Sequence, residues 1–477
     1  MITFLASIVL LIVGYAVYSK VVERIFGIDD GRKTPAYTKN DGLDFMPMGW
    51  LKGSLIQLLN IAGLGPIFGA IMGALYGPVA FIWIVIGSIF AGAVHDYFSG
   101  MLSLRHGGEQ YPTLVGRYLG KASKNIINII SIVLMILVAA AFTAGPAQLI
   151  ASITPLSLMS AIIIIFVYFL LASILPINQI IGKIYPIFGV ILVFMAVSIG
   201  IGMLFQDQTI PNLTFKNLHP GDLPIWPLLM VTISCGAISG FHCTQSPIIA
   251  RTMKKESDGR KIFYGAMIAE GVIAMIWAAA GMTFFGGTEG LQAALADGGP
   301  AGVVDEISKS LLGTLGGILA ILGVIILPIT TGDTALRSSR MMLVDLLSGF
   351  MNLDSKWKQS LLALPIVIPT FALTQMDYSF LWRYVGWTNQ VVATVMLWTA
   401  AIYLLKSNKF HWICSIPALF MTAVCGTYIF YAPEGFQLSY NISLTLGAII
   451  TTAVTVWFVL QVKNNNKSEG IEIKKAA

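Results

Sequence analysis

Apolar stretches about as long as a membrane is thick recur from one end of this chain to the other. A helix needs roughly 20 mostly apolar residues to cross the hydrocarbon core of a bilayer, and about thirteen such stretches lie among the 477 residues. Charged residues form 11% of the chain, against about 25% in a soluble domain. The sequence therefore predicts an all-α polytopic membrane protein with about 13 transmembrane helices, and it excludes a single soluble core.

Basic residues indicate how these spans are oriented. The spans are expected at residues 3–19, 54–75, 78–101, 126–147, 155–175, 184–205, 228–250, 263–285, 312–331, 358–374, 380–405, 412–431 and 440–462. Lys and Arg are enriched in cytoplasmic loops. With the N-terminus outside and the C-terminus cytoplasmic, 26 of the 29 basic residues fall on the cytoplasmic side, and Lys216, Lys309 and Arg383 remain outside. Topology thus accounts for the net charge of +6, and no nucleic-acid partner is expected.

The second span carries an interruption at its centre, in Asn60-Ile-Ala-Gly-Leu-Gly-Pro66. Proline lacks an N–H, and inside a helix its ring clashes with the carbonyl four residues earlier. Unpaired backbone at membrane depth is tolerated only where protein or a water-filled cavity receives it. We therefore predict that Asn60, Ala62, Gly63 and Gly65 bind substrate. The alternative is that the glycines of this span only allow close helix packing.

A second interruption lies in span 7, between Ser234 and Pro247. The two interruptions are five spans apart, an odd number, so two five-helix units would have opposite topology. Paired interruptions at corresponding positions of two halves indicate the binding site of an inverted-repeat transporter. Half-helix N-termini there offer N–H groups to an anionic substrate. The residues predicted to bind substrate in this span are Ser234, Gly236, Ser239, Gly240, Phe241, His242 and Gln245.

Glu270 is an acidic residue inside span 8. It lies nine residues past Lys261, and therefore roughly 13 Å into the membrane at about 1.5 Å per residue. Ionisable residues at such a depth are functional by default, and we predict that Glu270 carries a proton. The alternative is a protonated side chain that is hydrogen-bonded to a neighbouring helix. For His242 the alternatives are substrate contact or proton relay, and a core histidine whose hydrogen bonds are satisfied.

Span 9 is expected to end in Leu327-Pro-Ile-Thr-Thr-Gly-Asp333. The hydroxyls of Thr330 and Thr331 and the carboxylate of Asp333 are hard oxygen ligands of the kind that suit sodium. These residues are therefore predicted to couple an ion. Alternatively, Thr331 or Asp333 caps a surface helix that is predicted at 334–350.

His95 and Asp96 are expected at the inner end of span 3, close to Arg105 and His106. This position predicts an interfacial salt-bridge cluster or a gate rather than a catalytic pair. Residues 110–125, which are short, basic and amphipathic, are predicted to lie on the inner membrane surface.

Enzyme motifs are absent from the sequence, which has no GxSxG, HExxH or Walker loop. Energy for transport must then come from a gradient of H⁺ or Na⁺, and no cofactor and no metal site are expected. The four cysteines lack CxxC spacing, so structural disulfides and zinc are not expected. Two rival classes are an ion channel, which needs a continuous polar pore, and a membrane-embedded enzyme or sensor.

Several motifs in combination resemble the carbon starvation protein A family. They are Asn60–Ala70, Gly236–His242, Leu327–Arg337 and the turn from His95 to Gly108. The resemblance implies an inner-membrane protein of bacteria or archaea that imports peptides during carbon limitation; some members are instead pyruvate transporters that are regarded as proton-coupled. Its partners would be the lipid bilayer and a small carboxylate-bearing substrate. This chain is shorter than the long members, which have additional spans.

The family is grouped with the amino acid–polyamine–cation superfamily, which implies the five-plus-five inverted repeat of LeuT-type transporters. The expected parts are an extra N-terminal helix and cytoplasmic loop (1–52), the first repeat (53–205), the inverted second repeat (206–405), two C-terminal helices (406–462) and a cytoplasmic tail (463–477). The polar tail is expected to be disordered. Under this resemblance, the acidic stretch 286–309, which Gly298-Gly299-Pro300 divides, lies where such transporters carry an extracellular lid.

Overall fold

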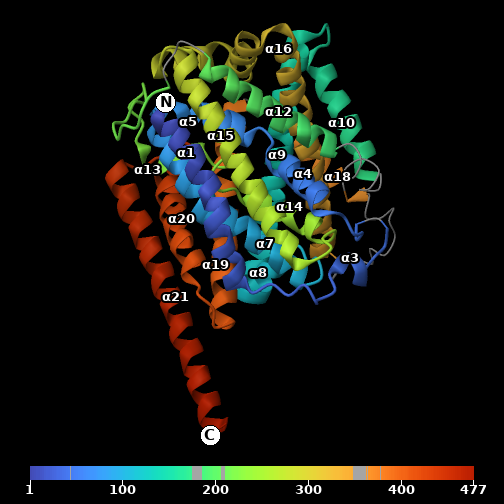
Figure 1. Ribbon diagram of the computed structural model, residues 1–477, viewed down its shortest axis with the longest axis vertical. Coiled ribbons are helices and arrows are strands. Elements are labelled where there is room, and N and C mark those ends of the chain that lie inside the picture. The colour runs from blue at the N-terminus through green and yellow to red at the C-terminus, as the bar shows by residue number, and fades with distance from the viewer. Residues whose placement is uncertain are drawn as a thin grey trace.

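The computed structural model describes residues 1–42, 44–174, 185–205, 210–347, 361–362, 364–376 and 378–476, and these residues are mostly helical. Figure 1 shows the N-terminus at one end of the molecule and the C-terminus at the opposite end. We call these the upper and the lower end. Within the described ranges, nine helices are long and apolar enough to cross a membrane, and one bent pair makes up a tenth span. The predicted class, an all-α membrane protein, is confirmed, whereas the number thirteen stays a prediction.

The helices of the first half correspond to the first six predicted spans. They are α1 (Ile2–Val13), η1 (Gly14–Tyr18) and α2 (Ser19–Phe26) for span 1; α4 (Trp50–Ile61), η2 (Gly65–Gly69), α5 (Ala70–Gly73) and η3 (Ala74–Tyr76) for span 2; α6 (Val79–Ile86), η4 (Gly87–Gly92) and α7 (Ala93–Arg105) for span 3; and α9 (Lys121–Ile153), α10 (Leu158–Ile174) and α12 (Tyr185–Leu204) for spans 4 to 6. Two short helices, α3 (Pro35–Thr38) and α8 (Tyr111–Leu119), lie in the connections. Gly77 ends span 2 with a φ of 80°, a left-handed value that only glycine adopts readily.

The helices of the second half correspond to predicted spans 7 to 13. They are α13 (Ile225–Thr232) and α14 (Gly240–Ala250), η5 (Glu256–Asp258), η6 (Arg260–Tyr264) and α15 (Gly265–Phe284), α16 (Thr288–Leu347), α18 (Leu364–Leu373), α19 (Tyr378–Lys406), α20 (Trp412–Tyr431) and α21 (Tyr440–Ala476). The helix α16 packs along α9, and α15 packs against both parts of the broken span 2. The two halves therefore interlock and do not form separate domains.

Span 9 does not end at Asp333, which corrects the prediction. The helix α16 continues through Pro328 and Asp333 to Leu347, and its two internal breaks lie earlier, at Gly299 and Gly313. The polar residues after Asp333 suggested a membrane surface, but Ser338 is buried and its hydroxyl bonds to the carbonyl of Thr244 in α14 at 3.3 Å. Asp333 is therefore an interior residue of a helix and not the cap of a surface helix. Residues 348–350 of the predicted surface helix lie outside the described residues.

One further expectation from composition is wrong, and the position of α8 relative to the membrane surface stays a prediction. The polar tail, for which disorder is predicted, continues α21 as helix to Ala476 (Figure 1). The predicted surface helix at 110–125 contains α8, whose Tyr111 is buried and donates its hydroxyl to the carbonyl of Val392 at 2.9 Å. The helix α8 therefore packs into the bundle, against α19.

Candidate functional site

Span 2 is interrupted where the sequence predicts it. The helix α4 ends at Ile61, helical structure resumes at Gly65, and the two parts are bent by 58°. Pro66 lies in the first turn after the break, where a missing N–H leaves no hydrogen bond unmade. Asn60, in the last turn of α4, is fully buried, and neither its amide nitrogen nor its amide oxygen has a hydrogen-bond partner among the described residues. The break therefore holds a polar side chain without a partner in the interior.

Span 7 is interrupted as well. The helix α13 ends at Thr232 and α14 begins at Gly240, with turns between them. Span 3 satisfies two carbonyls of this segment: Trp83 Nε1 donates to Ile233 O and Ser88 Oγ donates to Gly236 O, both at 3.0 Å. These bonds hold the unwound segment in place, because a buried carbonyl without a partner would cost about 1–3 kcal/mol.

The two interruptions touch one another, as the sequence analysis predicts. A Cβ atom added to Gly65 would overlap the side chain of Cys235, and one added to Gly236 would lie 3.8 Å from the Cα of Pro66. Glycine at both positions therefore allows the backbones of the two broken spans to approach closely. The oppositely running segments form one buried centre with no helix between them.

Asn389 of α19 caps the second half of span 7, and the sequence analysis did not identify it. Its Oδ1 accepts a hydrogen bond from the N–H of Phe241 at 2.6 Å, and its side chain also bonds the Ser239 hydroxyl. One of the N–H groups predicted to receive an anionic substrate is therefore already used. The sequence feature that could have identified Asn389 is the adjacent polar pair Asn389-Gln390 in an otherwise apolar span.

His242, in the first turn of α14, is the centre of a buried titratable cluster. Its Nδ1 lies 2.9 Å from Asp96 Oδ2, and its Nε2 lies 3.4 Å from Glu270 Oε2. The other oxygen of Asp96 lies 2.7 Å from Nδ1 of His95. All four side chains are fully buried. We call His95, Asp96, His242 and Glu270 the histidine–carboxylate cluster.

The position of His95 and Asp96 corrects the prediction. They lie in the first turn of α7, eight or more residues before that helix ends at Arg105, and they face His242 of the broken span. Span 3 is longer than its hydropathy suggests, since polar residues such as Ser99 and Ser103 are buried within it. The pair therefore belongs to the central site and not to an interfacial salt bridge with Arg105 and His106.

Glu270 is the member of the cluster with the fewest bonds. Neither carboxyl oxygen has a hydrogen-bond partner of good geometry among the described residues, and the nearest basic group is Nε2 of His242. Buried carboxyl groups are normally paired or hydrogen-bonded. Glu270 thus lies beside Nε2 of His242, while Asp96 holds the other side of the imidazole.

Thr330 and Thr331 lie beside the first interruption. Both hydroxyls donate to the carbonyl of Leu327 in their own helix, at 2.7 and 3.0 Å, and that of Thr331 also lies 3.4 Å from the carbonyl of Leu59. Thr331 therefore connects α16 to the last turn of α4. No group of three or more His, Cys, Asp or Glu side chains is placed to hold a metal ion in the part of the chain that the structure describes.

The remaining predicted substrate residues divide between the two interruptions. Ala62 and Gly63 lie in the first, and Gly63 faces Phe142 and Thr331. Ser234 lies in the second, next to Cys235, and Gly240 packs on the backbone of α19. Gln245 is directed elsewhere, since its amide lies 3.3 Å from the hydroxyl of Ser338 on α16. The structure therefore brings all of these residues to the centre except Gln245.

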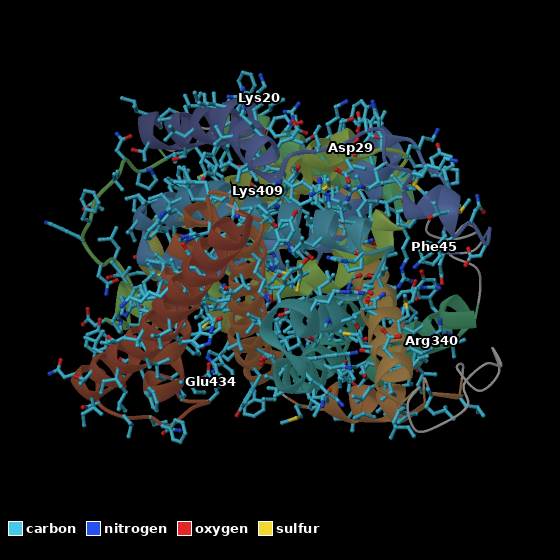
Figure 2. All side chains as sticks on the ribbon, turned by 90° about the horizontal axis from the view of Figure 1, so that it is seen from below. Lys20, Asp29, Phe45, Arg340, Lys409 and Glu434 are labelled. Carbon is cyan, nitrogen blue, oxygen red and sulfur yellow. The ribbon has the colours of Figure 1, made fainter. Side chains whose placement is uncertain are left out.

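The lower end of the molecule is closed by a different ion pair, Arg105 with Glu256. Nε and Nη2 of Arg105 donate to the two oxygens of Glu256 at 3.1 and 2.9 Å, and Nη1 donates to Tyr403 at 2.8 Å. The backbone N–H of Asp29 also donates to Glu256 at 2.8 Å. Figure 2 views this end from below, with Asp29 labelled. The pair joins α7 to the connection between α14 and α15 and holds Gly27 and Asp29 beside both.

The fold and this site define a membrane transport protein: a helical bundle with two facing interruptions and buried titratable groups between them. A model of the family described as carbon starvation protein CstA matches residues 1–217, 146–288 and 281–427. The chain belongs to the CstA family.

Several relatives match the chain, and some of them have functional names. An uncharacterised membrane protein of Haemophilus influenzae is 47% identical over 62% of this chain and 95% of its own length. The Escherichia coli protein named peptide transporter CstA is 23% identical over 90% of this chain and 81% of its own. The E. coli protein named pyruvate/proton symporter BtsT is 24% identical over 57% of this chain, which matches 47% of that protein.

A solved structure shares the fold. A manganese transporter of Eremococcus coleocola superposes with a TM-score of 0.51 at 14% identity and covers 89% of this chain and 99% of its own. At this identity the likeness concerns the fold alone. It supports the helical arrangement described above.

Proposed function

We propose that this protein is a secondary active transporter that imports small carboxylate-bearing nutrients, short peptides or pyruvate, during carbon starvation. The observation that carries the proposal is the position of His242. It lies in the first turn after a mid-membrane helix break, with Asp96 on one side and Glu270 on the other. A titratable group at a helix break connects a change of charge to a change of backbone position, which ion-coupled transport requires.

The fold that we propose is the LeuT-type five-plus-five inverted repeat, with span 1 and spans 12 and 13 added to it. Its support is the contact between two oppositely running broken spans, the packing of α9 on α16, which are spans 4 and 9, and the shared fold of a solved transporter. Spans 4 and 9 occupy the same position in the two repeats. The protein would lie in the cytoplasmic membrane with its N-terminus outside.

Protons are the coupling ion in this proposal. A proton on Glu270 passes to Nε2 of His242, and the imidazolium that forms is stabilised by the carboxylate of Asp96 at Nδ1. His95 holds the second oxygen of Asp96 and keeps that carboxylate oriented. Since His242 lies in the first turn of α14, its protonation changes the charge beside the unwound segment and so the relative stability of two positions of that segment.

The substrate would occupy the two interruptions. The buried amide of Asn60 is available to it, since this amide has no partner among the described residues. Buried polar groups of this kind are normally satisfied by water or a ligand. The N–H groups of Ala62 and Gly63 contribute less, because they already donate to the carbonyls of Leu58 and Ile61. The N–H of Phe241 contributes less, because Asn389 accepts from it.

The test is transport by the purified protein in proteoliposomes. With labelled pyruvate or labelled dialanine as the probe, we expect counterflow of at least one of them, and accumulation when the outside is made acidic. A protonophore should abolish accumulation and leave counterflow intact. Conductance without counterflow would identify a channel, and chemical conversion of the probe would identify an enzyme; either result would overturn the proposal.

A further inference from the structure

A cavity of about 340 Å³ opens near the upper end of the molecule, between span 2, α13, the first part of α16 and α19. Cavities that bind small molecules are mostly about 300 to 1,000 Å³, so this one suits a small ligand. Its lining combines aromatic rings with a few polar groups: Tyr76, His219, Tyr378, Trp382, Arg383 and Tyr428. None of the residues predicted from the helix interruptions lines it.

Arg383 carries the formal charge among the described residues of this lining. Its Nε lies 3.5 Å from Oε2 of Glu434, a carboxylate that is 3% exposed and that also receives the hydroxyl of Tyr428. Arg383 has no second ion pair among the described residues, and its side chain is 45% exposed. Part of the guanidinium is therefore accessible, and a planar guanidinium can bind a carboxylate through two hydrogen bonds.

Two other polar groups of the lining are His219 and Tyr378. Burial lowers the pKa of His219, which lies in the connection before α13. The hydroxyl of Tyr378, five residues before Arg383 on α19, is buried and has no hydrogen-bond partner in the described part of the chain. An unpaired buried hydroxyl is normally satisfied by water or by a ligand. Arg383 and Tyr378 therefore offer donors to an anionic group.

Aromatic rings separate this cavity from the centre of the molecule. Trp382 stacks on Tyr378 at 5.9 Å and on Phe142 at 6.5 Å between ring centroids. Trp382 and Tyr378 also contact Phe68 of η2, the turn that follows the first interruption. The floor of the cavity is thus in contact with the broken span itself.

We propose that this cavity is an entry subsite, which binds the carboxylate of the substrate through Arg383 and Tyr378 before the aromatic floor opens to the central site. This proposal rests on the proposed function, and it names the step that precedes central binding. The ligand class is a small carboxylate with an apolar part, which packs on Tyr76 and Trp382. The predicted topology leaves three basic residues on the outer side. Of these, Arg383 lines the cavity, and Lys216 and Lys309 do not.

The first experiment measures uptake kinetics in proteoliposomes with labelled pyruvate and labelled dialanine. Arg383→Gln should raise KM about tenfold, the effect of losing one charge-assisted hydrogen bond, and should change Vmax less than twofold. Arg383→Lys should give an intermediate KM, because lysine keeps the positive charge but lacks the planar guanidinium that makes two hydrogen bonds to a carboxylate. Lys216→Gln, which removes an exposed charge at the same end, is the control and should leave KM unchanged. A rise in KM with one substrate alone supports the subsite and identifies the source of the carboxylate; an unchanged KM with both overturns it.

The second experiment detects binding in the cavity without transport. The four native cysteines are buried, so a methanethiosulfonate reagent reports on Leu295→Cys, at a position in the cavity lining. Pyruvate or dialanine should slow the labelling of Leu295→Cys. The same protection is expected in the double variant Leu295→Cys/Glu270→Gln. It should be lost in the double variant Leu295→Cys/Arg383→Gln. Protection without transport by the unmodified protein would overturn the proposed function and keep the subsite. Transport without protection would overturn the subsite alone. If Arg383→Gln does not fold, Tyr378→Phe replaces it, with a smaller expected rise in KM.

Discussion

Nδ1 of His242 lies 2.9 Å from Oδ2 of Asp96, and this contact joins the first turn of the broken helix α14 to the unbroken helix α7. The two residues are 146 positions apart in the chain. Both are fully buried. In the interior of a protein, an ionised group is stable only with a partner. The charge of the imidazole and the position of the broken helix are therefore linked through one hydrogen bond.

Glu270→Gln should abolish proton-driven accumulation and leave counterflow largely intact. Glutamine has nearly the same shape as glutamate but cannot carry a proton, so the substrate site survives while Nε2 of His242 loses its proton donor. The measurement is accumulation of labelled pyruvate or dialanine across a pH gradient, compared with exchange at equal pH. Full accumulation by the variant would place the coupling group elsewhere.

Asp96→Asn should destabilise the protein as well as inactivate it. Asp96 accepts from two imidazoles, and removal of one partner from a buried ion pair costs about 3–5 kcal/mol. Asp305→Asn is the matched control, because the exposed pair of Asp305 with Lys309 contributes only about 0–1 kcal/mol. Thermal unfolding in detergent should show a large shift for the first variant and a small one for the second. Equal shifts would mean that the buried pair is not ionised.

The two interruptions could be predicted from sequence because glycine and proline act locally. Asn60 to Pro66 cannot form a regular helix whatever surrounds it, and the same holds for the turns before Gly240. Glu270 and His242 could also be identified singly, as ionisable groups in apolar spans. Their mutual contact could not, since nothing in the local pattern gives the rotation of one helix relative to another.

The errors concern polar residues that pack inside the bundle. Ser338 and the other polar residues after Asp333 suggested a membrane surface, whereas tertiary contacts bury them in α16. His95 and Asp96 were assigned to an inner helix end for the same reason. Asn389 caps α14 from a distant span, and a cap of that kind is visible only in three dimensions.

Gly240→Leu should abolish uptake and still insert into the membrane. A Cβ at this position would overlap the carbonyl oxygen of Asn389 and lie 2.5 Å from the nitrogen of Ala393, so the backbone of α19 must move. Overpacking of this kind typically costs about 1–3 kcal/mol. Gly302→Leu is the control, since nothing lies within 4 Å of its added Cβ. Membrane fractionation and uptake together test the prediction, and normal uptake by Gly240→Leu would remove the substrate from this interruption.

Uptake should not require sodium. The prediction follows from the proposed proton coupling through Glu270 and His242. The hydroxyls of Thr330 and Thr331 donate to a helix carbonyl, which does not prevent their oxygens from binding a cation, so the sodium site needs its own test. Replacement of sodium by choline should leave the rate of pyruvate or dialanine uptake within about twofold, whereas a protonophore should abolish accumulation. A strict sodium requirement would instead favour a cation site beside Thr331.

Arg105→Gln should loosen the lower end of the molecule. It removes both hydrogen bonds to Glu256, which also accepts from the N–H of Asp29, and the bond to the carbonyl of Gly27. Because hydrogen bonds to charged groups contribute about 1.5–3 kcal/mol each, amide hydrogen exchange of residues 27–34 should accelerate at least about tenfold, as followed by mass spectrometry in nanodiscs. Arg117→Gln breaks the pair with Glu109 at the same end, where Arg117 is 48% exposed, and it should leave this exchange unchanged. If both variants behave alike, Arg105 is a surface charge and closure of this end depends on other contacts.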